Sequence, residues 1–202
     1  MFPGQLNNIA VKVTQKEGEM LARALLFAAL TGIGAIIRIP LSPVPVTMQV
    51  FFVLLSGMVL GPFWGATSQL IYLAMGLCGA PFFAAPPYAG PAVLFGPTGG
   101  YLWGFVLAAG AAGWVSRYAA HKRLGDKRGV GLWYTCAGLA GIAVIYASGV
   151  AWLGTWLSLH GAKASLAYEL GVKPFILVDL AKAVAAASMA CLIPRRWSGP
   201  VL

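Results

Sequence analysis

The sequence predicts an all-α integral membrane protein with six transmembrane helices and both termini in the cytoplasm. Of its 202 residues, 59% are hydrophobic and only 9% are charged, whereas a soluble domain has about 25% charged residues. The apolar residues gather into six segments of roughly membrane-spanning length. Lysines and arginines lie between these segments, in the asymmetric arrangement that sets membrane topology.

The chain opens with a polar segment, residues 1–19, which we expect on the cytoplasmic side with a short interfacial helix over residues 9–16. Residues 20–202 are expected to form one six-helix transmembrane domain that binds the substrate. The first span is predicted from Met20 to Ile37. The polar segment precedes a full-length span, so we expect no cleaved signal peptide.

Small residues recur every fourth position in the first span, at Ala24, Ala28 and Gly32. Such a ridge lets another helix approach closely. The partner helix is either in the same molecule or in a second membrane protein that docks on this face. The sequence leaves both interpretations open.

Three prolines, Pro40, Pro43 and Pro45, follow the first span and predict an extended, stiff segment. Thr47 and Gln49 then open a second span that ends near residue 60. Gln49 is either a ligand-binding residue or a structural hydrogen-bonding group near the end of a helix.

A tight Gly61–Pro62 turn leads into a third span, predicted over residues 63–77. Gly57, Gly61 and Gly65 recur every four residues, so these two helices can pack closely through the turn.

The segment from Gly79 to Gly100 has five prolines, five glycines and no charge. It is too apolar for a solvated linker and too broken for a helix. Irregular backbone at membrane depth is tolerated where protein buries it or where it lines a cavity, so we expect a re-entrant loop or lid, with a plain connector as the alternative. Its Gly96–Tyr101 end lacks the Gly-Lys-Ser/Thr of a phosphate-binding loop, so ATP hydrolysis must take place in another chain.

The rest of the chain predicts three further spans, over residues 101–118, 130–157 and 174–193. A strongly basic loop, His121–Arg128, separates the first two of these spans. The span over residues 130–157 is long enough to be tilted, or broken near Ser148–Gly149.

The formal net charge of +9 does not indicate nucleic-acid binding, because the basic residues flank apolar segments. Ten lysines and arginines fall on the side of the termini and three on the other side. The ten are Lys12, Lys16, Arg23, Arg117, Lys122, Arg123, Lys127, Arg128, Arg195 and Arg196, and the three are Arg38, Lys163 and Lys173. The positive-inside rule therefore places both termini in the cytoplasm.

The last span contains one carboxylate and one ammonium, Asp179 and Lys182, in otherwise apolar sequence. Three helical residues turn about 300°, so both side chains leave one face of the helix. Ionisable residues inside a membrane are costly and normally mark a substrate or ion site. A mutual ion pair explains how both are buried, but two apolar residues would usually pack at least as stably. We therefore expect the pair to bind a small polar ligand near the outer face.

No enzyme motif appears in the sequence. The two histidines lie in loops on opposite sides, Asp179 is the only acidic residue within a span, and neither Gly-x-Ser-x-Gly nor His-Glu-x-x-His is present. The three cysteines have no metal-ligand spacing and an odd number. We expect no catalysis, no metal and no cofactor.

Four motifs occur in the order seen in one family of transport proteins. They are Pro43-Val-Pro45-Val-Thr47-Met-Gln49, Tyr72-Leu-Ala-Met-Gly76-Leu-Cys-Gly79-Ala-Pro81-Phe-Phe, Gly96-Pro-Thr-Gly-Gly-Tyr101 and Pro174-Phe-x-x-x-Asp179-x-x-Lys182. The sequence resembles the BioY family, the biotin-specific S components of energy-coupling-factor (ECF) transporters. The resemblance runs from the first span to the sixth, over about four-fifths of the chain.

The resemblance implies a bundle of the ECF S-component kind in a prokaryotic cytoplasmic membrane. Biotin would bind near the outer face, under loops that follow spans 1 and 3. The expected biotin-binding residues are Asp179, Lys182, Gln49, Thr47, Phe83, Tyr88 and Tyr101. Ala24 and Ala28 match the surface that docks on a transmembrane coupling subunit, and two ATPase subunits would drive uptake.

Three positions depart from the family pattern. Family members often have an asparagine near the position of Tyr88, and some have an arginine at the position of Leu102. A glycine is common in the family at the position of Val178. If both polar contacts are missing, the biotin carboxylate has fewer donors, which favours Lys182 as its partner. The sequence leaves open whether Lys182 contacts the ligand or only holds Asp179. An S component for another small vitamin, or a proton-coupled carrier using Asp179, are the alternatives.

Overall fold

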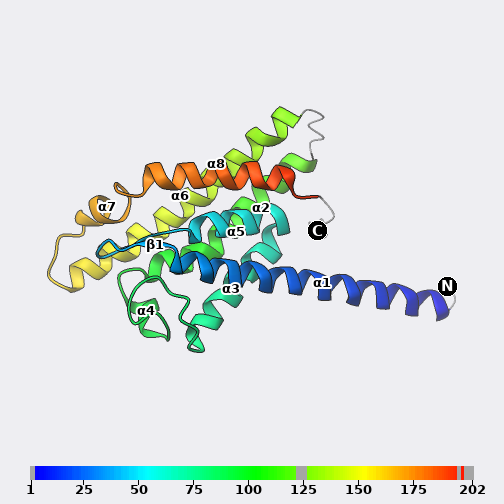
Figure 1. Ribbon diagram of the computed structural model, residues 1–202, viewed down its shortest axis with the longest axis horizontal. Helices are drawn as coiled ribbons and strands as arrows, with labels where there is room; N and C mark the ends of the chain where they lie inside the picture. The colour runs from blue at the N-terminus through cyan, green and yellow to red at the C-terminus, as the bar shows by residue number, and fades with distance from the viewer. Residues whose placement is uncertain (1–2, 122–126, 195–196, 198–202) are drawn as a thin grey trace.

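Helices account for most of the chain in the computed structural model, which describes residues 3–121, 127–194 and 197. Within these ranges, six helices have 12 residues or more and run side by side (Figure 1): α1 (Pro3–Ile36), α2 (Gln49–Leu60), α3 (Pro62–Leu77), α5 (Gly99–His121), α6 (Lys127–Leu159) and α8 (Ile176–Leu192). Shorter elements join them at one end of the bundle: β1 (Arg38–Ile39), β2 (Val46–Thr47), α4 (Ala92–Phe95) and α7 (Leu166–Gly171).

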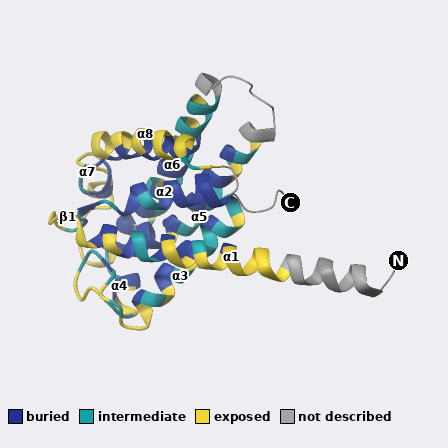
Figure 2. Cartoon of the chain, turned by 45° about the vertical axis from the view of Figure 1, so that its right-hand side comes forward, coloured by how far each residue is buried: buried dark blue, intermediate teal, exposed yellow. Residues whose placement is uncertain are grey.

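Helix α2 is the centre of the bundle. Eleven of its 12 residues are buried, and it packs against α1, α3, α5, α6 and α8. Figure 2 shows its ribbon almost entirely in the colour of buried residues. With 12 residues α2 is only about 18 Å long, and its neighbours shield it along its length.

Helix α8 carries its polar residues inward and its large apolar residues outward. Leu177 and Leu192 are 78% and 83% exposed, whereas Asp179 and Lys182 are only 3% and 7% exposed. The buried face is otherwise alanine, at positions 183, 186, 187 and 190. This distribution is the reverse of the one found in a helix of a water-soluble protein, and it suits a helix whose outer face meets lipid.

Glycines let the helices approach closely, as expected for the turn between α2 and α3. A Cβ atom built on Gly65 would lie 2.7 Å from the Cα atom of Gly57, so no larger residue fits between these helices. Gly61 in the turn has a φ angle of +87°, which an L side chain rarely adopts.

Two helices among the described residues are long and apolar enough to cross a membrane by length and composition, Thr14–Ile36 and Val130–Leu159. The other long helices do not meet this test, so six spans remain a prediction. Helix α6 is continuous over 33 residues. The break considered near residues 148–149 is therefore absent from this helix, and α6 is about 50 Å long.

The N-terminal region differs from the prediction in one respect. Helix α1 begins at Pro3 and passes without a break through residues 19 and 20, where a polar segment was expected to end. Arg23 donates a hydrogen bond to Glu19 at 3.0 Å within this helix. This i,i+4 ion pair stabilises the helix across the expected boundary.

The small-residue ridge of α1 is used inside the molecule. Ala24 and Ala28 have no exposed surface, and α1 packs on α2 and α3. Close helix packing in the same chain therefore accounts for both alanines. In this conformation their side chains are covered by the chain itself, and docking of a second membrane protein on α1 stays a prediction.

The segment after α1 is extended as expected, and it forms a two-stranded antiparallel ribbon. Arg38 pairs with Thr47 and Ile39 with Val46. In Figure 1, β1, α4 and α7 lie at one end of the bundle, and α1 starts at the opposite end, toward which α8 runs. The irregular segments therefore gather at a single end.

Candidate functional site

A cavity lies at the end of the bundle where the ribbon and the short helices gather. Its empty volume is about 570 Å³, including the part open to solvent. Its lining residues lie in or next to the β1–β2 ribbon, α2, α5, α6, α7 and α8, and in the loop after α3. They are Val44, Pro45, Thr47, Gln49, Val50, Ala84, Ala85, Thr98, Tyr101, Leu102, Phe105, Ile145, Tyr146, Gly171, Phe175, Asp179 and Lys182.

Asp179 and Lys182 form a buried ion pair in the cavity wall. The Lys182 ammonium donates to Asp179 Oδ1 at 2.7 Å, and the Tyr146 hydroxyl donates to Asp179 Oδ2 at 2.8 Å. Asp179 is in the first turn of α8, where the positive end of the helix dipole stabilises a carboxylate. Groups of the protein therefore compensate both charges.

The ion pair keeps unused hydrogen-bonding capacity. A lysine ammonium has three N–H donors and each carboxylate oxygen accepts more than one hydrogen bond. Asp179 occupies one donor of Lys182, and Lys182 and Tyr146 each occupy one site on Asp179. The site therefore offers both acceptors and donors to one ligand while carrying no net charge from the pair.

Gln49 and Thr47 stand together in the cavity wall. The Thr47 hydroxyl donates to Gln49 Oε1 at 3.0 Å, and Gln49 Nε2 donates to the Tyr72 hydroxyl at 2.6 Å. Tyr72 in turn donates to the backbone carbonyl of Phe82 at 3.1 Å. Gln49 is thus both a cavity-lining residue and part of a structural network, so the two interpretations of it do not exclude each other.

Two glycines position Tyr101 at the cavity. Its ring lies where a Cβ atom of Gly149 would be, and its hydroxyl group lies where a Cβ atom of Gly171 would be. The hydroxyl donates to the backbone carbonyl of Gly171 at 2.9 Å. Tyr101 therefore joins α5 to α6 and to the end of α7, and presents its ring to the cavity.

Arg38 on β1 joins the two loops that border the cavity. Its guanidinium donates to the backbone carbonyl of Ala84 at 3.0 Å and lies 4.4 Å from the centre of the Tyr88 ring. Tyr88 has a φ angle of +67°, in the left-handed region. Ala84 and Ala85 line the cavity, so Arg38 holds one wall of the cavity against the ribbon.

Five of the seven predicted ligand-binding residues are brought together in the cavity lining: Asp179, Lys182, Gln49, Thr47 and Tyr101. Phe83 and Tyr88 are not in that lining. Phe83 is buried against Tyr72, with ring centres 5.9 Å apart. Tyr88 lies outside the cavity, with the Arg38 guanidinium over its ring. Both support the wall behind the cavity, and neither faces its interior.

Sequence reasoning missed Tyr146 and Thr98. A hydroxyl group in the middle of an apolar span is the signal that could have identified Tyr146. Thr98 lies within the Gly96–Tyr101 motif, from which only Tyr101 was predicted to bind the ligand, and it lines the cavity.

Two further observations concern ionisable side chains outside the cavity. Among the described residues, no three His, Cys, Asp or Glu side chains are close enough to hold a metal ion. After α7, Lys173 donates to Glu169 at 2.8 Å, and this hydrogen bond raises the pKa of the Lys173 ammonium.

These features define a class of protein: an apolar helical bundle with a cavity that is lined by a buried ion pair. Residues 8–199 match the BioY family, and the chain belongs to this family. The resemblance drawn from the four motifs is thereby confirmed.

Individual relatives agree with this assignment. The chain is 42% identical over 170 residues to "Biotin transporter BioY" of Thermotoga maritima, covering 84% of this chain and 92% of that protein. It is also 42% identical over 165 residues to "Probable biotin transporter BioY" of Pyrococcus horikoshii, covering 82% and 90%.

A solved structure shows the same fold. It is the crystal structure of "the S-component for biotin from an ECF-type ABC transporter", with a TM-score of 0.74 over 88% of this chain and 92% of that one. At 22% identity, this likeness concerns the fold. It confirms the predicted all-helical bundle of the S-component kind.

Proposed function

We propose that this protein is the biotin-binding S component of an ECF-type transporter, which takes up biotin across the cytoplasmic membrane of a prokaryote. The family and the relatives' names support transport, and not catalysis, as its activity. The observation that carries the site assignment is the buried Asp179–Lys182 pair, which faces the cavity with hydrogen-bonding capacity left over.

The chemistry of biotin suits the lining. Its ureido ring has two N–H donors, which match the carboxylate of Asp179 and the amide oxygen of Gln49. The ammonium of Lys182, which already holds Asp179, is the proposed partner of the biotin carboxylate. Its apolar bicycle and valerate chain match Phe105 and Phe175. Thr47 and Tyr101 complete the proposed set. Phe83 and Tyr88 are proposed as wall residues without direct contact.

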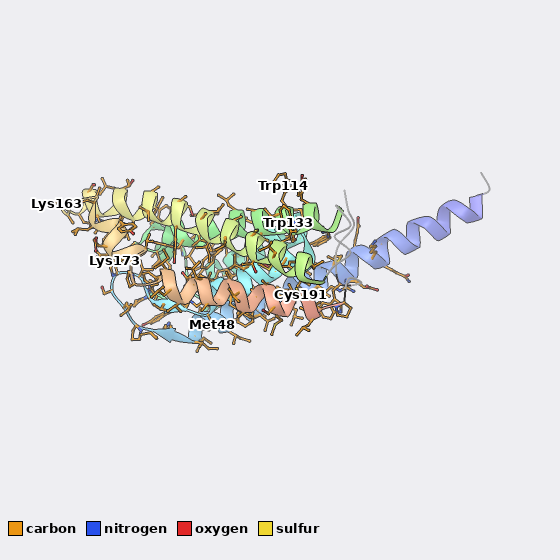
Figure 3. The ribbon with its side chains drawn as sticks, turned by 90° about the horizontal axis from the view of Figure 1, so that it is seen from above. Met48, Trp114, Trp133, Lys163, Lys173 and Cys191 are labelled. Carbon is orange, nitrogen blue, oxygen red and sulfur yellow. The ribbon has the colours of Figure 1, made fainter. Side chains whose placement is uncertain are left out.

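We place six helices across the membrane, with both termini in the cytoplasm. The start of α1 and the end of α8 lie at one end of the bundle, and Figure 3 shows Lys163 and Lys173 at the other. On α6, Trp133 and Trp156 are 23 residues apart, about 35 Å along the helix. Tryptophans favour the two membrane–water interfaces, so this spacing suits a hydrocarbon core of about 30 Å.

A transmembrane coupling subunit and two ATPase subunits are the proposed partners, because the chain has no phosphate-binding loop of its own. Docking on α1 is retained as a proposal for the helix as a whole. Direct contact through Ala24 and Ala28 is not proposed, since both side chains are buried between helices.

Mass spectrometry of the small molecules retained by the purified protein tests the substrate. Biotin released on denaturation at near one-to-one occupancy is the expected result. A different vitamin at that occupancy would keep the fold assignment and reject biotin as the substrate. The Asp179→Asn variant, purified in parallel, controls for biotin that adheres to detergent or to another surface.

A further inference from the structure

Tyr72 on α3 connects the cavity to the loop that follows α3. The side chain is fully buried. Its hydroxyl oxygen lies 2.6 Å from Gln49 Nε2 and 3.1 Å from the carbonyl oxygen of Phe82. Gln49 Oε1 in turn lies 3.0 Å from the Thr47 hydroxyl. Four groups from four elements therefore form one chain of hydrogen bonds.

The direction of this chain follows from its last member. A backbone carbonyl can only accept, so the single proton of the Tyr72 hydroxyl is donated to Phe82. The Tyr72 oxygen then acts as an acceptor toward Gln49, and only the amide nitrogen of Gln49 can donate to it. Gln49 Oε1 is left on the other side of the amide, beside Thr47, which lines the cavity.

We propose that Tyr72 is a positioning residue that makes Gln49 present its carbonyl oxygen to the ligand. The site at Gln49 then accepts an N–H group, with the second lone pair of Oε1 as the acceptor. A ligand carbonyl at this point would meet another oxygen. The chemical class of the ligand, a cyclic urea with N–H donors, rests on the proposed function; the orientation of Gln49 does not.

The reversed amide is disfavoured by burial. It would place Gln49 Oε1 against the Tyr72 oxygen, and Tyr72 could donate to it only by leaving the carbonyl of Phe82. Tyr72 and Gln49 are 0% and 2% exposed, and a buried polar group without a partner is costly. The backbone carbonyl of Phe82, in the loop after α3, therefore determines which way the Gln49 side-chain amide on α2 is oriented.

A conservative substitution and an internal control within the same chain can test the role of Tyr72. The Tyr72 ring packs edge-on against Phe83, with centres 5.9 Å apart, so Tyr72→Phe keeps the ring and removes only the hydroxyl. The chain has four glutamines, at positions 5, 15, 49 and 69. Gln69 is an internal control, because its Nε2 lies 3.0–3.4 Å from the hydroxyls of Thr31, Ser56 and Ser68.

The first experiment needs no ligand. Side-chain amides are observed by NMR in protein labelled with ¹⁵N-glutamine, and Gln49→Met identifies the Gln49 signals. We expect Tyr72→Phe to accelerate hydrogen exchange of the Gln49 amide at least about tenfold, because a buried hydrogen-bond acceptor is lost, and to leave Gln69 unchanged. Equal exchange of Gln49 in both proteins would overturn the proposal.

The second experiment compares biotin with its two derivatives methylated at one ureido nitrogen. Wild type should bind one derivative at least about tenfold more weakly than biotin, since a methyl group removes the N–H that Gln49 accepts. Tyr72→Phe should reduce this discrimination, and should have no further effect in the Gln49→Met background. Additive effects of the two substitutions would show that Tyr72 does not act through Gln49. A wild type that binds no biotin but gives the expected NMR result would reject the proposed function and support the orientation of Gln49.

Discussion

The hydroxyl of Tyr146 on α6 donates a 2.8 Å hydrogen bond to the carboxylate of Asp179 on α8. Together with Lys182, it leaves both carboxylate oxygens hydrogen-bonded before any ligand enters. The carboxylate is therefore held in one orientation in the cavity wall. Preorganisation of this kind lowers the entropic cost of ligand binding.

Tyr146→Phe should weaken biotin binding about three- to tenfold, because a hydrogen bond to a charged group is worth about 1.5–3 kcal/mol and part of it orients Asp179. Equilibrium binding of radiolabelled biotin measures the effect. Tyr168→Phe is a matched control, since Tyr168 is 55% exposed on α7 and outside the cavity lining. Equal losses of biotin affinity in the two variants would show that Tyr146 has no specific role in the site.

Gly149→Ala should displace the Tyr101 ring, which lies where the new methyl group would be. We expect weaker biotin binding and a lower Tm, since overpacking costs about 1–3 kcal/mol. Gly131→Ala, on the same helix, is the control because nothing lies within 4 Å of its Cβ position. A variant at Gly149 that binds and melts like the one at Gly131 would contradict the proposed packing of Tyr101.

Arg38→Ala should accelerate biotin release, because it removes the contacts to Ala84 and Tyr88 that join the two loops. A cation–π contact at an exposed site is worth about 0.5–1 kcal/mol, so together with the hydrogen bond we expect a rise of about three- to tenfold in the dissociation rate. A chase with unlabelled biotin measures this rate. Lys163→Ala, another exposed cation expected at the same end, should leave it unchanged, and an unaltered rate in Arg38→Ala would exclude a closing role.

Topology can be tested by labelling single cysteines with an impermeant maleimide in intact cells. Cys78, Cys136 and Cys191 would first be replaced by alanine. A cysteine at Lys163 should react from outside, and one at Lys16 only after the membrane is opened. The reverse result would invert the orientation drawn from the positive-inside rule.

Much of the fold follows from the sequence, because helices that are apolar on most faces appear as long apolar segments. Regularly spaced glycines in turn predict where two helices pack closely. The long helices start and end within about three residues of the predicted spans, apart from α1 at its N-terminal end. Polar residues in the first 19 positions favoured a break there. A helix can continue past the apolar stretch as long as its side chains remain solvated, and hydropathy does not detect this continuation.

The site was predictable where a residue breaks the local pattern. Asp179 and Lys182 stand out in an apolar helix, and both line the cavity. The hydroxyl group of Tyr146 is a weaker signal than a charge, because a tyrosine within a span is acceptable against lipid, protein or ligand. Phe83 and Tyr88 depend on the backbone path of an irregular loop, which residue types alone do not determine. Ala24 and Ala28 show that a small-residue ridge predicts close approach without identifying the partner helix.

Equilibrium binding of radiolabelled biotin shows whether the Asp179–Lys182 pair forms part of a biotin site. Wild type should bind biotin at one site per chain. Asp179→Asn and Lys182→Ala should each weaken binding at least about tenfold, because each removes a charged hydrogen-bonding partner. The double variant Asp179→Asn/Lys182→Met leaves no unpaired charge, which controls for misfolding through Tm. Unchanged affinity in both single variants would show that the Asp179–Lys182 pair is not part of the biotin site.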